Sequence, residues 1–99
     1  MNFGFHRAAL REHLDEVAFY EGRLRGLGAD YLVEFEAIMA CVCASPESYP
    51  VVTPPAIRKA GLKRFPFDVI FRVESAQVVI LAIAHHRRRP NYWIGRAIK

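Results

Sequence analysis

The chain has 99 residues, of which 53% are hydrophobic, and it carries a formal net charge of +4. This length suits one domain with its own core, spanning 1–99, and the longest apolar runs are far shorter than the roughly 20 residues that cross a bilayer. Because the first residues lack the apolar run of a secretory signal, we expect a cytoplasmic protein with no membrane segment.

The first expected element is a short strand at 2–6, where Phe3 and Phe5 alternate with smaller or polar residues. An amphipathic helix of about four turns follows from Ala8 and ends at Gly26-Leu27-Gly28. The residues that we expect on its buried face are spaced by whole turns: Leu10, Leu14, Val17 and Leu24.

A second helix is expected from Ala29 to Ala44, ended by Ser45-Pro46 and packed antiparallel to the first. Cys41 and Cys43 lie two apart on it and point in different directions, so they predict neither a disulfide nor a metal pair. We expect both to be small buried hydrophobes. The apolar stripe of this helix consists of Tyr31, Phe35, Ile38 and Val42.

Residues 45–55 contain four prolines and predict a loop. Three strands are expected after it, at 57–62, 67–73 and 77–84, with a hairpin turn at 74–77 and a short helical tail after Pro90. The last strand is apolar on both faces, which is typical of an interior strand. The element order predicts an α+β fold, in which an antiparallel helix hairpin packs on one face of a mostly antiparallel sheet.

Charge is distributed unevenly along the chain. Residues 1–56 carry four basic and eight acidic side chains, a net charge of −4, whereas residues 57–99 carry ten basic and two acidic ones, a net charge of +8. Charge that serves only solubility usually mixes both signs. The polarity therefore indicates an anionic partner, either a polyanion or an acidic protein.

Two motifs in the basic half resemble the RelE/ParE family of bacterial toxins. One is Phe65-Pro66-Phe67 before an apolar strand. The other runs from Val79 to Trp93, where a buried strand is followed by two histidines, three arginines, a proline and an aromatic pair. The resemblance covers nearly the whole chain. It implies a β-α-α-β-β-β fold, the function of a toxin in a type II toxin–antitoxin module, and an oligomer with a cognate antitoxin.

The resemblance leaves two cellular targets open. ParE-like members inhibit DNA gyrase and have no accepted catalytic centre, whereas RelE-like members cut mRNA on the ribosome. Arg88 and Tyr92 fall near the arginine and tyrosine of the RNA-cutting members, but Asp68 stands where those members carry a strand arginine. This mismatch favours gyrase inhibition, with ribosome-dependent mRNA cleavage as the alternative.

The segment 85–93 nevertheless contains the parts that RNA cleavage needs. His85 or His86 could act as acid or base near neutral pH. The arginines at 87–89 could hold a phosphate, and Tyr92 or Trp93 could stack on an unpaired nucleobase. Adjacent strand residues point to opposite faces, so at most one histidine shares a surface with a given arginine, and the arginines gather only if the backbone bends before Pro90. For either target, the candidate binding residues are Lys63, Arg64, Arg87, Arg88, Arg89 and Trp93.

Several features are expected to be structural. Tyr92 and Trp93 could equally be packing residues, and His6 and His13 belong to no motif and are expected to be structural or surface residues. The histidines and cysteines fall at no familiar ligand spacing, and there is no glycine-rich phosphate loop, so we expect no metal site and no cofactor.

Overall fold

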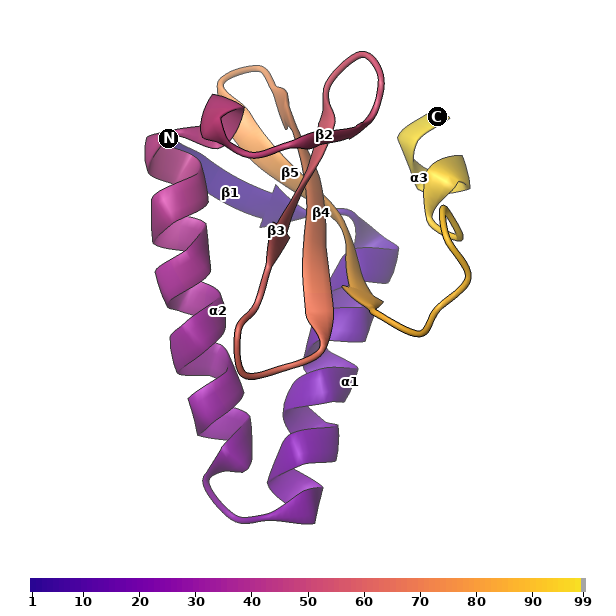
Figure 1. Ribbon diagram of the computed structural model, residues 1–99. Coiled ribbons are helices and arrows are strands. Elements are labelled where there is room, and N and C mark those ends of the chain that lie inside the picture. The colour runs from indigo at the N-terminus through magenta and orange to yellow at the C-terminus, as the bar shows by residue number, and fades with distance from the viewer. Residues whose placement is uncertain (99) are drawn as a thin grey trace.

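The computed structural model describes residues 1–98 and contains one five-stranded sheet with two long helices on one face (Figure 1). The elements in chain order are β1 (Asn2–Phe5), α1 (Arg7–Arg23), α2 (Leu27–Ala44), a 3-10 turn (Pro46–Ser48), β2 (Val51–Thr53), β3 (Ile57–Gly61), β4 (Phe67–Glu74), β5 (Gln77–His85) and α3 (Ile94–Ile98). The α+β fold expected from the sequence is confirmed. Within residues 1–98, no helix is both long enough and apolar enough to cross a membrane.

The strands lie in the order β1-β5-β4-β3-β2, and all neighbouring pairs are antiparallel except β1 with β5. The turn between β4 and β5 places Ser75 and Ala76 at positive φ angles of 51° and 61°, where the sequence predicts a hairpin turn. β5 is the best-buried strand: Val78, Ile80 and Ala82 are fully buried. Its expected interior position is confirmed along the length that β1 covers.

The loop expected at 45–55 contains one more strand, β2. Three residues flanked by Pro50 and Pro54 give little strand pattern, because proline cannot donate a ladder hydrogen bond. β2 lies at the edge of the sheet and pairs with β3 alone, where short strands and prolines are tolerated.

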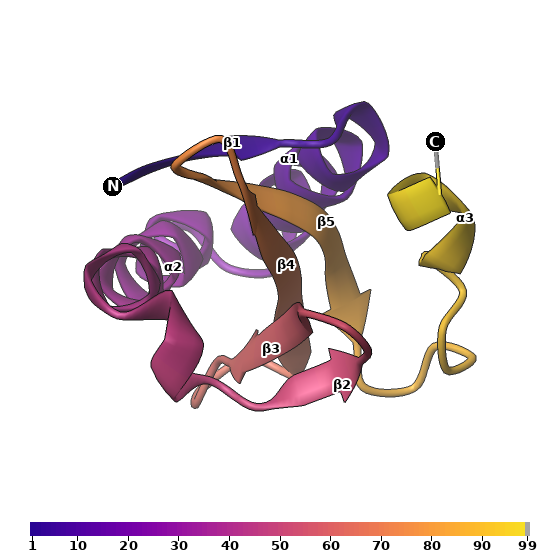
Figure 2. The same cartoon turned by 90° about the horizontal axis from the view of Figure 1, so that it is seen from above.

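The helix face and the opposite face of the sheet hold separate apolar clusters. On the helix face, Tyr31, Phe35 and Met39 of α2 pack against Phe67, Val69 and Phe71 of β4. On the opposite face, Trp93 packs against Ile57, Ile70, Leu81 and Ala82. Viewed from above, α1 and α2 lie on one side of the strands, while the segment that carries α3 lies beside β5 (Figure 2).

Two expectations about the helix surfaces are wrong. In α1 the buried side chains are Ala9 and His13, whereas Leu10, Leu14 and Leu24 are exposed. In α2, Cys41 is exposed and Cys43 is half-buried, because Val42 between them occupies the core position. Residues two apart on a helix lie about 200° apart around its axis, so both cysteines could not face the same core.

Candidate functional site

The histidine–arginine segment lies at the end of β5, next to the exposed half of the sheet. Asp68 on β4 pairs with Gly61 on β3 and with Ala84 on β5, so it occupies the middle of this surface. Its carboxylate oxygens lie 3.3 Å from His86 Nε2 and 4.0 Å from Lys59 Nζ. One carboxylate therefore contacts both Lys59 of β3 and His86, the residue that directly follows β5.

A cavity of about 300 Å³ opens over this group. The sheet supplies its floor through Lys59, Asp68 and His86, and the segment after β5 supplies one wall. The wall residues are Arg88, Arg89, Pro90, Asn91, Tyr92 and Trp93. Eight residues of the segment 85–93 thus line the same cavity as four residues from β2, β3 and β4, namely Val52, Lys59, Asp68 and Ile70.

The two histidines point to opposite faces of the sheet, as the alternation of a strand requires. His85 contacts the buried ring of Phe67 edge-on, with ring centroids 5.2 Å apart, and its Nδ1 accepts a 3.0 Å hydrogen bond from the backbone N–H of Arg87. His86 faces Asp68 instead. Both histidines line the cavity, but His86 is the one that contacts the Asp68 carboxylate there.

The three arginines diverge. The chain turns directly after β5, where the Arg88 N–H bonds to the His85 carbonyl at 2.9 Å, and this bend before Pro90 brings Arg88 and Arg89 to the cavity. The Arg88 guanidinium stacks over the Tyr92 ring at 3.8 Å. Arg87 is exposed and does not line the cavity.

Tyr92 and Trp93 both hold the segment in place. The Tyr92 hydroxyl donates a 2.8 Å hydrogen bond to Glu12 of α1. Burial, together with this hydrogen bond, raises the pKa of Tyr92 well above its usual range. A phenol with so high a pKa is a poor general base at neutral pH. Trp93 is only 4% exposed and contacts the second apolar cluster.

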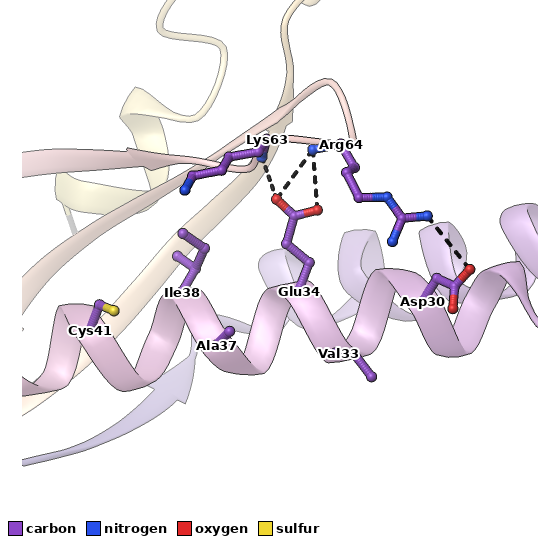
Figure 3. A pocket seen from close by; sticks show the side chains of 8 residues that line it. All are labelled: Asp30, Val33, Glu34, Ala37, Ile38, Cys41, Lys63 and Arg64. Atoms are coloured by element: carbon purple, nitrogen blue, oxygen red, sulfur yellow. Dashed lines mark hydrogen bonds and ion pairs between the residues drawn. The ribbon is translucent and has the colours of Figure 1, made fainter.

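Lys63 and Arg64 belong to a different part of the surface. They lie in the loop between β3 and β4, above α2, where both backbone N–H groups bond to the Glu34 carboxylate (Figure 3). Arg64 also forms a 3.6 Å ion pair with Asp30. This loop and α2 enclose an apolar groove of about 410 Å³, with Val33, Ala37, Ile38 and Cys41 along the helix.

Sequence reasoning missed Lys59 and treated Asp68 only as a mismatch. A period-two pattern could place both on the same face, because Lys59 pairs with Ile70 on β4, two residues from Asp68. It also missed Glu12 and Arg96, which form a 2.9 Å ion pair across 84 positions of the chain. No local pattern reports a contact over such a distance.

The arrangement around the cavity suits anions and proton transfer. Lys59, Arg88 and Arg89 could hold a phosphate, and His86 could exchange a proton while Asp68 orients its ring. In residues 1–98, no group of three or more histidine, cysteine or acidic side chains is close enough to hold a metal ion.

No protein-family model matches the sequence, and no curated protein matches it either. Among solved structures, the chain is similar to a chain of the chromosomal ParDE TA system from P. aeruginosa, with a TM-score of 0.72 and 18% sequence identity. The match covers 86% of this chain and 95% of that chain. The fold is RelE/ParE-like. The fold that the sequence resemblance implies is therefore confirmed, and at this identity the likeness concerns the fold.

Proposed function

We propose that the protein is the toxin of a type II toxin–antitoxin module and that a cognate antitoxin neutralises it by forming a complex. The observation that carries this proposal is the likeness in fold to a chain of a ParDE TA system over nearly the whole length of both chains. The +8 charge of residues 57–99 supports it, because a basic surface suits an acidic protein partner.

The target that we favour is DNA gyrase, bound and inhibited without chemistry on a substrate. Asp68 places a carboxylate beside Lys59 and His86, at the point where RNA-cutting relatives are expected to carry an arginine. The Tyr92 hydroxyl is hydrogen-bonded to Glu12 and holds the chain rather than a substrate. Binding would then rest on Arg88 and Arg89 at the cavity and on the exposed Arg87 next to them in the chain. Since gyrase acts in the bacterial cytoplasm, we propose the same compartment for the toxin.

A ribosome-dependent mRNA endoribonuclease is the second candidate, and the Asp68–His86 pair favours it. A histidine oriented by a carboxylate is a suitable general base for removing a proton from a 2′-hydroxyl. Arg88 and Lys59 could then stabilise the negative charge that develops on the phosphate.

The class of the protein is tested by co-expressing the tagged chain with the product of the adjacent gene. We expect growth arrest when the chain is expressed alone, relief by the neighbouring protein, and co-purification of the two. If no adjacent gene product binds the chain or relieves growth arrest, the assignment as a toxin is wrong.

The target is tested by brief expression followed by two measurements, the DNA-damage response and the integrity of mRNA. Gyrase inhibition predicts DNA damage and filamentous cells, weakened when Arg87, Arg88 and Arg89 are changed to glutamine but little affected by His86→Gln. Arg23→Gln, which removes an exposed charge at the far end of α1, is the matched control. Codon-specific mRNA cuts that disappear in His86→Gln, with a rate reduced roughly 10²-fold, would establish the nuclease instead.

A further inference from the structure

The segment after β5 is attached to the rest of the molecule mainly by side chains. Its backbone hydrogen bonds are local: Tyr92 N–H bonds to Arg89 O, Ile94 N–H to Asn91 O, and Arg96 N–H to Trp93 O. The last backbone bond that ties this part of the chain to the sheet comes from His86, whose N–H bonds to Pro66 O at 2.9 Å. Residues 87–98, called the strap below, therefore begin where sheet pairing ends.

One carboxylate accepts three hydrogen bonds from side chains of the strap. Glu12 of α1 accepts hydrogen bonds from Arg96 at 3.0 and 2.9 Å and from the Tyr92 hydroxyl at 2.8 Å. It also accepts the Ile83 N–H at 3.0 Å, which ties α1 to β5. Burial acts to raise the pKa of Glu12, but the hydrogen bonds from Arg96, Ile83 and Tyr92 outweigh it and hold the pKa below its ordinary value.

These contacts satisfy the edge of β5 where β1 no longer covers it. β1 pairs only with residues 77–80 of β5. Beyond that point, Leu81 O accepts from Arg96 at 3.0 Å, Ile83 N–H donates to Glu12, and Ile83 O accepts from Tyr92 at 3.4 Å. Side chains thus occupy the position of a neighbouring strand, and the exposed edge is covered without a backbone ladder.

Trp93 is the one fully buried apolar side chain of the strap, and the partly buried Tyr92 and Ala97 pack against the same cluster. Trp93 is buried on the second apolar cluster, whereas residues 87–91 are exposed, and so are Ile94 and Ile98. One further hydrogen bond, from Arg72 to the Ala97 carbonyl at 2.8 Å, fixes the end of the strap. The main core lies on the other face of the sheet, and the strap contributes nothing to it.

We propose that the strap is a latched conformational unit: residues 87–98 open together about the chain after His86, with Glu12 as the latch, while the sheet and both long helices stay folded. Opening removes Trp93, Arg88 and Arg89 from the cavity wall and leaves Lys59, Asp68 and His86 in place on the sheet. The cavity therefore exists only while the strap is closed against the sheet. This inference is independent of which target the protein acts on.

The experiment uses the full chain and its single tryptophan, Trp93, as a reporter. Acrylamide quenching of Trp93 fluorescence is followed against urea alongside the far-UV circular dichroism of the helices. Amide hydrogen exchange is measured for residues 88–98, for Ile83, and for Val78–Ile80 in the part of β5 that β1 covers. The variants are Glu12→Gln, which weakens the latch, and Arg96→Lys, which keeps the charge but loses the two-point contact. Glu16→Gln on the same helix is the matched control.

In the wild type, we expect Trp93 to become accessible to acrylamide at a lower urea concentration than that at which the circular dichroism signal of the helices is lost. In Glu12→Gln, exchange in the strap and at Ile83 should rise at least about tenfold, with Val78–Ile80 unchanged. Arg96→Lys should give a smaller change of the same pattern, and Glu16→Gln none in the strap. If Trp93 exposure and helix loss coincide in the wild type and in both latch variants, or if exchange rises equally in the strap and in Val78–Ile80, the strap is part of the global fold and the proposal is wrong.

Discussion

His13 is a buried polar side chain within the aromatic part of the core. Its ring packs against Phe5 and Phe35, at centroid distances of 5.1 and 4.3 Å, and its Nδ1 shares a 3.1 Å hydrogen bond with the Tyr31 hydroxyl. Burial lowers the pKa of His13 below its ordinary value, so the folded protein keeps the ring neutral. A residue that the sequence leaves without a role is therefore part of the packing between β1, α1 and α2.

This burial predicts an acid-sensitive contribution to stability. The unfolded chain protonates His13 at its ordinary pKa, whereas the folded chain resists protonation, so the unfolded state binds more protons as pH falls. Stability is therefore present above the unfolded pKa of about 6.5 and is lost as pH falls below it. Urea denaturation at about pH 7.5 and about pH 5.5 should show a larger loss for the wild type than for His13→Gln. Equal losses in the two proteins would assign the acid sensitivity to other groups.

At the scale of the elements, α1 is rotated about its axis from the expected orientation: Val17 packs against the core as expected, but Ala9 and His13 are buried in place of Leu10 and Leu14. The spacing of Leu10 and Leu14 correctly predicts a helix but not which of its faces meets the sheet. Ala9 is fully buried, and the small side chain allows close approach to β5, while Glu12 binds the Ile83 N–H. These contacts fix the rotation of the helix and leave the leucines outside. The periodicity of apolar residues predicts that a segment is helical. Which face of the helix is buried depends on the contacts that the helix makes in the folded protein.

The same substitution, leucine to alanine, is expected to have different effects on stability in the buried strand β5 and on the exposed face of α1. Leu81 on β5 is 1% exposed, and Leu14 on α1 is 55% exposed. Leu81→Ala should lower the free energy of unfolding by roughly 2–5 kcal/mol, because it removes buried surface and leaves a cavity. Leu14→Ala should change it by no more than about 0.5 kcal/mol. Chemical denaturation measures both, and a comparable cost at the two positions would contradict the orientation of α1.

The sequence predicts the helices and the three longer antiparallel strands because each has its own periodicity or turn signal. The 74–77 turn and the divergence of His85 and His86 are likewise local consequences of strand geometry. β2 escapes prediction because three residues between prolines carry almost no pattern. The contacts of Tyr92 and Arg96 with Glu12 escape it because they join residues 80 or more positions apart. The sequence therefore predicts which residue types form the candidate site, but it does not predict their hydrogen-bonding partners.

Across the whole molecule, the acidic and basic residues that lie in different halves of the sequence also lie on different elements of the fold. The acidic residues of the first half are concentrated on α1 and α2, and the basic residues of the second half lie on β3 to β5 and on the segments that follow these strands. Several contacts join the two parts, among them Arg96 with Glu12 and Arg64 with Asp30. The exposed arginines 87–89 remain on the basic side.

If the protein is a toxin as we propose, this division predicts that its association with an acidic antitoxin depends on salt. Exposed charges separated by more than about 10 Å are screened at about 0.1 M salt, so electrostatic attraction during approach weakens as salt is added. The association rate constant should fall by about tenfold between roughly 0.05 and 0.5 M salt, with a smaller change in the dissociation rate. Changing Arg87, Arg88 and Arg89 to glutamine should flatten this dependence, and Arg23→Gln should not. Stopped-flow mixing with the purified partner measures it.

The parallel pairing of β1 with β5 has a consequence for the synthesis of the protein. β1 is translated well before its hydrogen-bonding partner in the sheet, residues 77–80. Until then a nascent chain has the helix hairpin but lacks the strand that β1, β4 and Glu12 all contact, and contacts so distant in sequence form slowly. The sheet is thus completed only after β5 has been translated. A nascent chain that lacks β5 therefore has neither the closed core nor the cavity beside this strand, and both form only once β5 is available.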